Sequence, residues 1–373
     1  MRKSQDFEAL LDEADALAEV QVKEESPELL ATIPSVTVAD LETKEYEPPI
    51  LVSEDREGTG VTVLLHEVPS SFGIIYVDFG VDISVLDFDD IILLPLFASL
   101  IVDGGTEKYD DMKIAREIGK NTGGIESEIL LHSILSPNAT AQYEIPTGDS
   151  FTSKLFLHGS ASKDKSESLF ELLSQIMFEA RLDNQDRALG ILRDKIANLE
   201  RQLSAGGTRY SDSRIGARYT PTSVIEELYQ GVSSIPKLHS ILETAENDWA
   251  SLLARLQKMK ASIVNSDRKG MILNLTGEKD VLKHCGPVLS HFIVNQLPER
   301  STGSPLPDFA TEPHPWLEEA RQLMAEKSPL RNEGKLCLAD ETIREDCYII
   351  AACKLTVRDS FFLQSQGLFH LPR

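Results

Sequence analysis

Apolar and polar positions alternate with a period of two in several segments after residue 50, which predicts β-strands. The predicted strands are 61–66, 74–81, 125–135, 140–144, 154–159, 262–265 and 271–276. In other segments the apolar residues recur at helical spacing, three or four residues apart. The predicted helices are 91–102, 109–119, 165–181, 183–203, 223–229, 249–259 and 281–296. The pattern therefore predicts a mixed chain in which strands and helices follow one another closely.

The order of these elements favours an α+β domain over residues 50–298, with helices packed on one face of a sheet. Helical spacing over 4–22 predicts a helical arm, and Glu47-Pro48-Pro49 predicts an extended connector, so residues 1–49 form an arm rather than a domain. Six prolines between 298 and 329 predict a linker over 299–333. Residues 334–373, with strand-like stretches at 347–352 and 355–357, are then a divergent C-terminal tail.

The charge of the chain changes which partners we expect. It has 60 acidic and 37 basic residues, a formal net charge of −23. Because nucleic acids and anionic lipids select basic surfaces, we expect neither as a partner. The longest apolar run, 91–102, is too short to cross a bilayer, and the acidic start of the chain resembles neither a signal nor a transit peptide. Four cysteines without a C-x-x-C pair predict reduced thiols rather than a disulfide framework.

The usual catalytic and metal-binding motifs are missing. His66-Glu67 begins like a zinc-peptidase motif, but the second histidine would have to be at position 70, which is Ser70. The histidines are at 66, 132, 158, 239, 284, 291, 314 and 370, and no two are four residues apart. Gly104-Gly105 and Gly123-Gly124 lack the lysine of a phosphate loop and predict turns. We therefore expect no catalytic, cofactor-binding or metal-binding residue in this chain.

Two local clusters of charged residues have more than one interpretation. Arg209-Tyr210 and Arg214 to Tyr219 combine basic and aromatic residues. They fit a helix end with solvated arginines, or a contact with a peptide or carbonyl oxygen. A run of acidic residues fits a solvated rim, or a surface that attracts a cationic peptide. Its members are Asp82, Asp87, Asp89, Asp90, Asp103, Glu107, Asp110 and Asp111.

The spacing of residues 94–125 carries a resemblance to a known family. The segment 94–106 ends in Gly104-Gly105-Thr106, a predicted helix follows, and Thr122-Gly123-Gly124 comes next. This spacing resembles the opening domain of the pitrilysin-type zinc peptidases, in which H-x-x-E-H on a helix precedes a Gly-Thr and a later Gly-Gly turn. The positions of the two histidines and the glutamate fall on Leu96, Ser99 and Leu100. None of these side chains suits zinc or the activation of water, so the pattern resembles a degenerate, non-catalytic copy.

A longer collinear set of short motifs resembles the third domain of the presequence protease family of plant type. These motifs lie at 33–36, 94–97, 120–125, 214–218, 248–249, 297–299 and 329–333. After 333 the resemblance ends, and the R-x-x-G-G-x-Y pattern of the family's fourth domain is absent. The resemblance implies a pitrilysin-type fold with a mostly antiparallel sheet. It also implies a truncated product that lacks the family's zinc-bearing and C-terminal domains.

The resemblance also implies a function. The family hydrolyses unfolded and targeting peptides with zinc-activated water, in the mitochondrial matrix or chloroplast stroma. We therefore expect a peptide-contacting part of the chamber wall that holds no cofactor itself and is inactive alone, although the parent enzyme uses zinc. The alternative is a stand-alone peptide-binding or scaffold protein on a degenerate peptidase fold. An unrelated α+β enzyme has no supporting motif.

Overall fold

The computed structural model describes a large part of the chain in separate ranges. These are 13–18, 21, 26–34, 36–41, 49–53, 59–133, 151–205, 207–218, 220–264, 268, 270–299, 315–327, 336–338 and 351–353. The chain divides into two compact units, residues 1–47 and 48–373. In the first unit, residues 13–18 are helical, in agreement with the predicted helix 4–22 as far as it is described. Two short helical turns follow, α2 (Pro27–Leu30) and the 3₁₀ turn η1 (Val38–Asp40).

The second unit is built on a six-stranded sheet. Its strands are β1 (Ile50–Ser53), β2 (Val61–Glu67), β3 (Ile74–Asp82), β4 (Ile125–Ser133), β5 (Phe151–Ser162) and β6 (Met271–Gly277). The spatial order is β1-β2-β6-β3-β5-β4. The pair β2–β6 is parallel and the other four pairs are antiparallel. The structure thus confirms the prediction of an α+β fold with a mostly antiparallel sheet.

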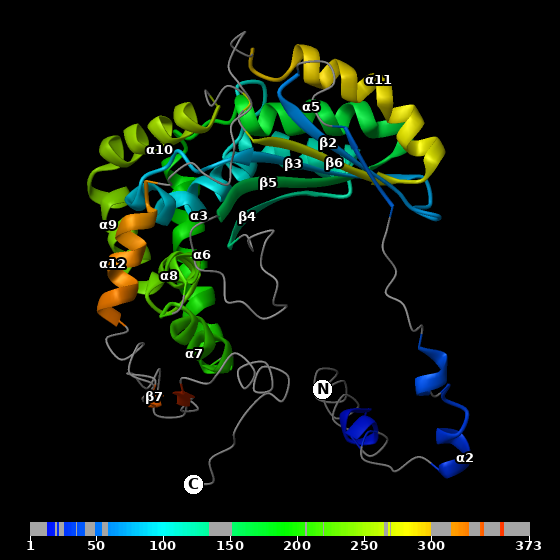
Figure 1. The fold of residues 1–373 in the computed structure, drawn as a ribbon, viewed down its shortest axis with the longest axis horizontal. Coiled ribbons are helices and arrows are strands. Elements are labelled where there is room, and N and C mark those ends of the chain that lie inside the picture. Colours follow the sequence, from blue (N-terminus) through cyan, green and yellow to red (C-terminus); the bar gives the residue numbers. More distant parts are fainter. Residues whose placement is uncertain are drawn as a thin grey trace, which may run out of the picture. The chain divides into compact units, whose positions relative to one another are not determined.

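Alternation along the strands separates the two faces of the sheet. In β3, Ile75 and Val77 are fully buried, whereas Tyr76 between them is 46% exposed. Helices α5 (Ser166–Phe178) and α11 (Lys279–Asn295) cover the buried face (Figure 1). Phe292 of α11 fixes this layer, because its ring packs edge-on against Phe79 at 5.4 Å between centroids. The opposite face of the sheet, which holds Tyr76, is called the open face below.

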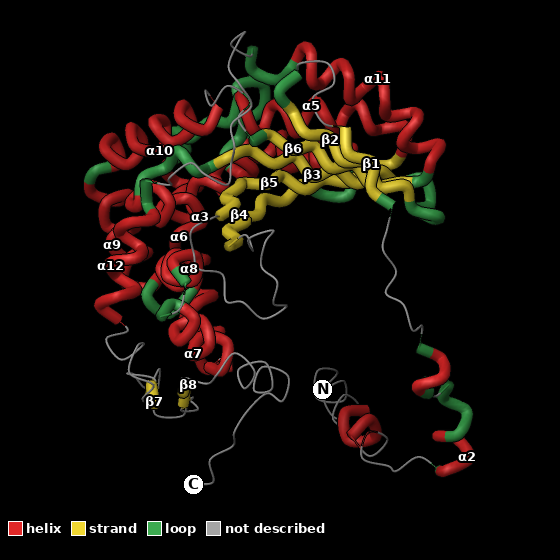
Figure 2. The backbone as a smooth tube through the Cα atoms, in the orientation of Figure 1, coloured by secondary structure: helices red, strands yellow, loops and turns green. Residues whose placement is uncertain are grey.

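The remaining helices pack beside the sheet (Figure 2). They are α3 (Phe88–Asp103), α4 (Asp111–Asn121), α6 (Gln185–Ala205), α7 (Gly207–Gly216), α8 (Pro221–Gln230), α9 (Ser234–Asn247), α10 (Trp249–Val264) and α12 (Leu317–Lys327). Helix α3 contacts β4, where Ser127 Oγ donates to the Ala98 carbonyl. Asp87 and Asp110 cap the N-termini of α3 and α4 by accepting backbone N–H bonds at 3.0 and 2.7 Å. No helix among the described residues is long and apolar enough to span a membrane.

Most predicted elements are present, with differences that have physical causes. The predicted strand 262–265 is wrong where it is described, because Ile263 continues the buried face of α10 with Leu256 and Met259. Helices α7, α9 and α12 and strand β1 are not among the predicted elements. Helix α12 lies within the predicted linker 299–333, where fully buried Trp316 packs on Phe151 with 5.8 Å between ring centroids. The predicted strand 140–144 lies outside the described residues.

Towards the C-terminus two short strands form an antiparallel pair, β7 (Leu336–Leu338) and β8 (Ala351–Cys353). Strand β8 overlaps the end of the predicted strand at 347–352, and the predicted strand at 355–357 lies outside the described residues. Cys285 on α11 is a free, buried thiol. The domain boundaries expected from the sequence remain a proposal.

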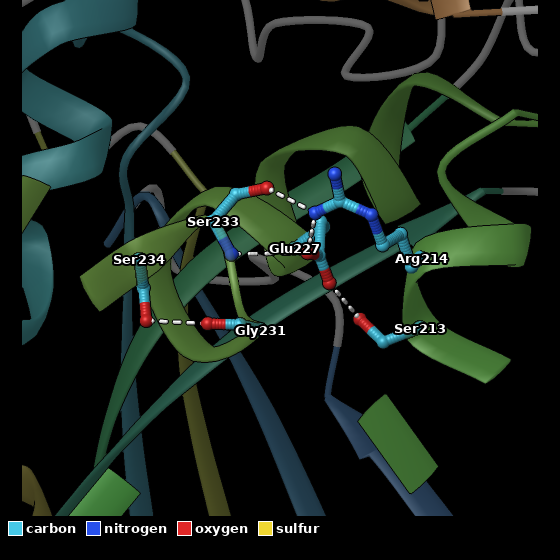
Figure 3. A network of polar contacts seen from close by, with 6 residues as sticks. All are labelled: Ser213, Arg214, Glu227, Gly231, Ser233 and Ser234. Atoms are coloured by element: carbon cyan, nitrogen blue, oxygen red, sulfur yellow. Dashed lines mark hydrogen bonds and ion pairs between the residues drawn. The ribbon is translucent and has the colours of Figure 1, made fainter. Parts of the chain in front are cut away.

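A buried ion pair joins α7, α8 and the start of α9 (Figure 3). The Glu227 side chain is 1% exposed, and its Oε1 lies 3.5 Å from Arg214 Nη1. Its two oxygens also accept hydrogen bonds from Ser213 Oγ at 2.8 Å and the Ser233 backbone N–H at 3.1 Å. A Cβ on Gly231 would collide with this carboxylate, so glycine is required at that close approach. The charge of Glu227 is stabilised in the interior because each side of it has a donor.

Replacing Arg214 tests this assignment. Arg214→Met leaves the buried carboxylate without its cation, so the free energy of unfolding should fall by about 2–3 kcal/mol. The double variant Arg214→Met/Glu227→Met should recover part of that loss, since it removes both charges. Denaturant unfolding measures both changes.

The matched control is Arg193→Met, which breaks the exposed pair of Arg193 and Glu246. That substitution should cost less than about 1 kcal/mol. Equal losses for Arg193→Met and Arg214→Met would contradict a special role for the buried pair.

Candidate functional site

The helix that resembles a zinc-binding helix has an apolar interior in place of ligands. Leu96 and Leu100 of α3 are 2% and 0% exposed and belong to the hydrophobic core. Ser99 Oγ donates to the Pro95 carbonyl at 2.9 Å, within the same helix. Two buried leucines and a serine bonded to its own backbone do not fit zinc, which takes nitrogen, sulfur or carboxylate ligands. No step of zinc chemistry can be assigned to these residues.

The histidines are distributed over separate elements. His66 lies on β2, His132 on β4 and His158 on β5. Both His284 and His291 are exposed on α11. Over the ranges that the structure describes, no group of three or more His, Cys, Asp or Glu side chains could hold a metal ion. The expected lack of catalytic and metal-binding residues stays a prediction.

The open face of the sheet carries a row of polar and aromatic side chains. The strand register places Asp78 of β3 beside His158 of β5 and Asn274 of β6. On the next strand, Glu126 is the cross-strand partner of His158, and Glu128 is the partner of Phe156. Since side chains of one face recur every second residue, all of these share the open face with Tyr76.

His158 is the centre of this row. Its Nδ1 lies 2.8 Å from Asp78 Oδ1, and its Nε2 lies 2.9 Å from Glu128 Oε2. Asn274 Nδ2 donates to the other oxygen of Asp78 at 2.7 Å. The imidazole also stacks on Phe156 with 5.6 Å between centroids and 18° between planes. Each ring nitrogen thus faces a different carboxylate, an arrangement that suits a protonated imidazole and leaves no lone pair for a metal.

The shifts in pKa follow from these contacts. The hydrogen bond to Asp78 raises the pKa of His158, and its charge attraction to both carboxylates adds to this, whereas partial burial opposes the rise. Burial works to raise the pKa of Asp78, but the hydrogen bonds from His158 and Asn274 outweigh it, so the pKa of Asp78 is lowered. The charged forms of both groups are therefore stabilised together.

Helix α8 brings further carboxylate and hydroxyl groups to this side of β4. Burial raises the pKa of Glu226, and the nearby charge of His132 opposes the rise. Burial also raises the pKa of Tyr229, assisted by the charges of Glu226 and Glu128. The acidic character of the open face therefore continues from β4 onto α8.

A cavity of about 280 Å³ lies between α7 and α8. Its lining residues are Arg209, Tyr210, Asp212, Ser213, Gly216, Ser223, Glu226 and Gln230. Tyr210 is 4% exposed and its hydroxyl donates to Gln202 Oε1 at 3.2 Å. The sequence reasoning missed Asp212, Glu226 and the cavity as a whole, because the pattern does not predict helix α7 itself.

The cluster of basic and aromatic residues divides into separate roles. Arg209 is exposed and lines the cavity. Arg214 is the partner of buried Glu227, so the interpretation as a solvated arginine is wrong for this residue. Tyr219 lies outside the described residues. Contact with a peptide or carbonyl oxygen stays a prediction.

The acidic run also needs a correction. Asp82 and Asp90 are each 4% exposed, so the interpretation as a solvated rim is wrong for both. Asp90 accepts from Arg255 Nε at 2.6 Å, and Asp82 lies 3.7 Å from Lys154 Nζ. The other members fit a rim better, since they cap helices or make exposed ion pairs such as Asp103–Arg187.

The predicted turns at the paired glycines are confirmed. Gly105 and Gly124 have φ angles of +92° and +125°, which favour glycine. Neither turn has a phosphate-binding lysine, in agreement with the sequence.

Comparison with known proteins matches a family and several curated relatives. The family described as associated with peptidase M16, subfamily C, matches residues 2–241. Presequence protease 1 (chloroplastic/mitochondrial) of Arabidopsis thaliana is 26% identical over 299 residues, 79% of this chain and 26% of that protein. The mitochondrial presequence protease of Danio rerio is 24% identical, covering 79% and 27% of the two chains. Protein HypA of Clostridium perfringens is 25% identical over 73% of this chain and 26% of its own.

Solved structures with a similar backbone include two proteins of bacterial origin. The inactive domain of a peptidase M16 from Pseudomonas fluorescens aligns with a TM-score of 0.44 and 15% identity, over 71% of this chain and 54% of that one. The periplasmic protease PqqL of Escherichia coli aligns with a TM-score of 0.41 and 12% identity, over 78% and 30%.

The extent of these matches decides what they establish. The chain spans about a quarter of the length of the curated relatives it matches. The family match covers well over half of the chain and includes α3, the open face as far as β5, and the α7–α8 cavity. The chain belongs to the family associated with the subfamily C peptidases of M16.

Proposed function

We propose that this chain is a non-catalytic, peptide-contacting part of a zinc metalloendopeptidase of the presequence protease type. The observation that carries the proposal is the open face, where a row of carboxylate, imidazole and aromatic groups has no helix of the described unit packed on it. The relatives named presequence protease support a peptide as the ligand. The buried leucines at positions 96 and 100 support a role without catalysis.

The chemistry of the open face favours an unfolded, basic peptide. Glu128 presents a carboxylate with its side chain 61% exposed, and Glu126 lies on the same face two residues away. Tyr76, 46% exposed, adds an aromatic surface for apolar side chains. A net charge of −23 adds long-range attraction for cationic peptides. Peptides of this kind include cleaved targeting sequences of organelles.

The parent enzyme's zinc-bearing and closing domains would complete the peptide chamber. In that arrangement the peptide is cut on the catalytic domain while this chain supplies part of the wall. By the names of the relatives, which are chloroplastic or mitochondrial, we place the parent enzyme in the mitochondrial matrix or chloroplast stroma. Stand-alone binding by this chain is the second candidate, and the same surface would serve it.

The purified chain should not hydrolyse peptides. We expect less than stoichiometric zinc and no turnover of a fluorogenic peptide, because Leu96, Ser99 and Leu100 supply neither ligands nor a base. Elemental analysis and a continuous fluorescence assay measure these two quantities. Stoichiometric zinc together with turnover that a chelator abolishes would refute a non-catalytic role.

The chain should bind a synthetic unfolded peptide that contains several Arg and Lys residues and has both ends capped. Glu128→Gln should weaken this binding about two- to fivefold at low salt, the range expected for an exposed charge pair. The difference should shrink at high ionic strength, since salt screens exposed charges. Fluorescence anisotropy of a labelled peptide measures the affinity.

The matched control is Glu243→Gln, which removes an exposed carboxylate from α9 instead of the open face. It should change the affinity much less than Glu128→Gln. Equal effects of the two variants would mean that net charge, rather than the open face, determines binding.

The raised pKa of His158 predicts a pH-dependent stability. Because the folded-state pKa is raised above the unfolded value of about 6.5, the contribution of His158 is fully present below that pH and lost as the pH rises through the folded value. His158→Gln should therefore destabilise the protein more at pH 6 than at pH 9, by less than about 1 kcal/mol for a partly exposed ring.

The lowered pKa of Asp78 sets the acid limit of the same effect. Its contribution is present above the unfolded value of about 3.9 and is lost as the pH falls through the folded value. Denaturant unfolding at several pH values, with wild type and His158→Gln in parallel, checks the prediction. A constant difference between pH 6 and pH 9 would contradict it.

A further inference from the structure

The cavity between α7 and α8 has charges of both signs on its walls. Arg209 and Asp212 come from α7, and Glu226 comes from α8. Arg209 and Asp212 are three residues apart on one helix, so their Cβ atoms are about 5–6 Å apart. The cavity thus combines one guanidinium with two carboxylates.

These three charges lack partners within the described part of the protein. No hydrogen bond or ion pair joins Arg209, Asp212 or Glu226 to another described side chain. The contrast with Arg214 and Glu227 on the same two helices is sharp, since that pair is matched and closed by Ser213 and Ser233. The charges in the cavity are therefore available to an incoming ligand.

Burial supports this interpretation of the two carboxylates. It raises the pKa of Asp212, for which no compensating group is found among the described residues, and it raises the pKa of Glu226 against the weaker influence of His132. A cation in the cavity would relieve this cost of desolvation. The neutral wall leaves few other donors, because the hydroxyls of Tyr210 and Ser213 already donate to Gln202 and Glu227.

The size of the cavity limits what can enter. About 280 Å³ is at the lower end of the range for ligand sites, roughly 300–1,000 Å³. Such a space suits an amino acid or a dipeptide and excludes a long folded ligand. A free dipeptide carries an ammonium and a carboxylate only a few ångströms apart, which matches the two kinds of charge on the walls.

We propose that the α7–α8 cavity binds short zwitterionic peptides, with the ammonium group on Asp212 and Glu226 and the carboxylate on Arg209. Occupants of this kind are the free ends or small products of peptide hydrolysis. The site is separate from the open face and goes beyond the function proposed above.

Binding of alanyl-alanine to the full chain tests the proposal by isothermal titration calorimetry. The free dipeptide should bind in the millimolar range or better, and blocking either end, as N-acetyl-alanyl-alanine or alanyl-alanine amide, should weaken binding about tenfold or more. These comparisons use the wild-type protein alone, so they do not depend on the folding of any variant. Equal binding of free and blocked dipeptides, or no binding at millimolar concentration, would overturn the proposal.

Variants then assign each end of the ligand. In Arg209→Gln, the free dipeptide and its amide should bind equally, because the partner of the carboxylate is gone. In Glu226→Gln, acetylation of the ligand should matter less than in wild type, while amidation should still weaken binding. Glu243→Gln serves as the control and should behave as wild type. Thermal unfolding of each variant confirms that it is folded.

An unchanged preference for the free carboxylate in Arg209→Gln would also overturn the proposed orientation. The capped basic peptide used for the open face has no free ends and is too long for the cavity. Failure of that peptide to bind would therefore count against the proposed function alone, whereas the dipeptide series counts for or against the cavity alone.

Discussion

The structure depends on the burial of one face of a twisted sheet. Val77 and Phe79 of β3 and Leu157 of β5 are all fully buried under α5 and α11. Each such side chain contributes about 1.5–3 kcal/mol when it leaves water. Because side chains alternate, the same strands must present Asp78 and His158 on the other face. The candidate site is thus a geometric consequence of the hydrophobic core.

The same constraint explains why the zinc-like helix cannot simply regain a metal. Positions 96 and 100 of α3 point into the core, where leucines fill the space. Histidines there would need hydrogen-bonding partners or an ion, and burying them without either costs free energy. Packing and catalysis compete for the same positions, and in this chain packing has the positions. Membership in a peptidase-associated family and a lack of metal ligands on α3 are therefore compatible.

Regular patterns make most of the fold predictable from sequence. Strand β6 and helix α5 have clean periods of two and 3.6 residues, and the predicted bounds of both agree with the structure within a few residues. Helix α7 has only a weak apolar stripe, and α12 follows a proline-rich stretch, so local signals do not reveal them. The pattern places Ile263 in a strand because a short apolar run fits both a strand and a helix end.

The candidate site is less predictable because its contacts join distant segments. His158 is 80 residues from Asp78, and Asp90 is 165 residues from Arg255. Without an alignment, a polar residue in an alternating strand shows only that it faces away from the core. Which carboxylate it meets depends on strand order, and here β6 enters the sheet between β2 and β3. The order of the strands, rather than any local motif, assembles the row on the open face.

The central claim is that peptides contact the open face. Photo-cross-linking tests it most directly, with a capped basic peptide that carries a benzophenone side chain, followed by mass spectrometry of the full chain. The account predicts cross-links to Tyr76, Phe156 and neighbouring residues of β3, β4 and β5. Cross-links confined to the outer surfaces of α5 and α11, or spread evenly over the chain, would contradict it.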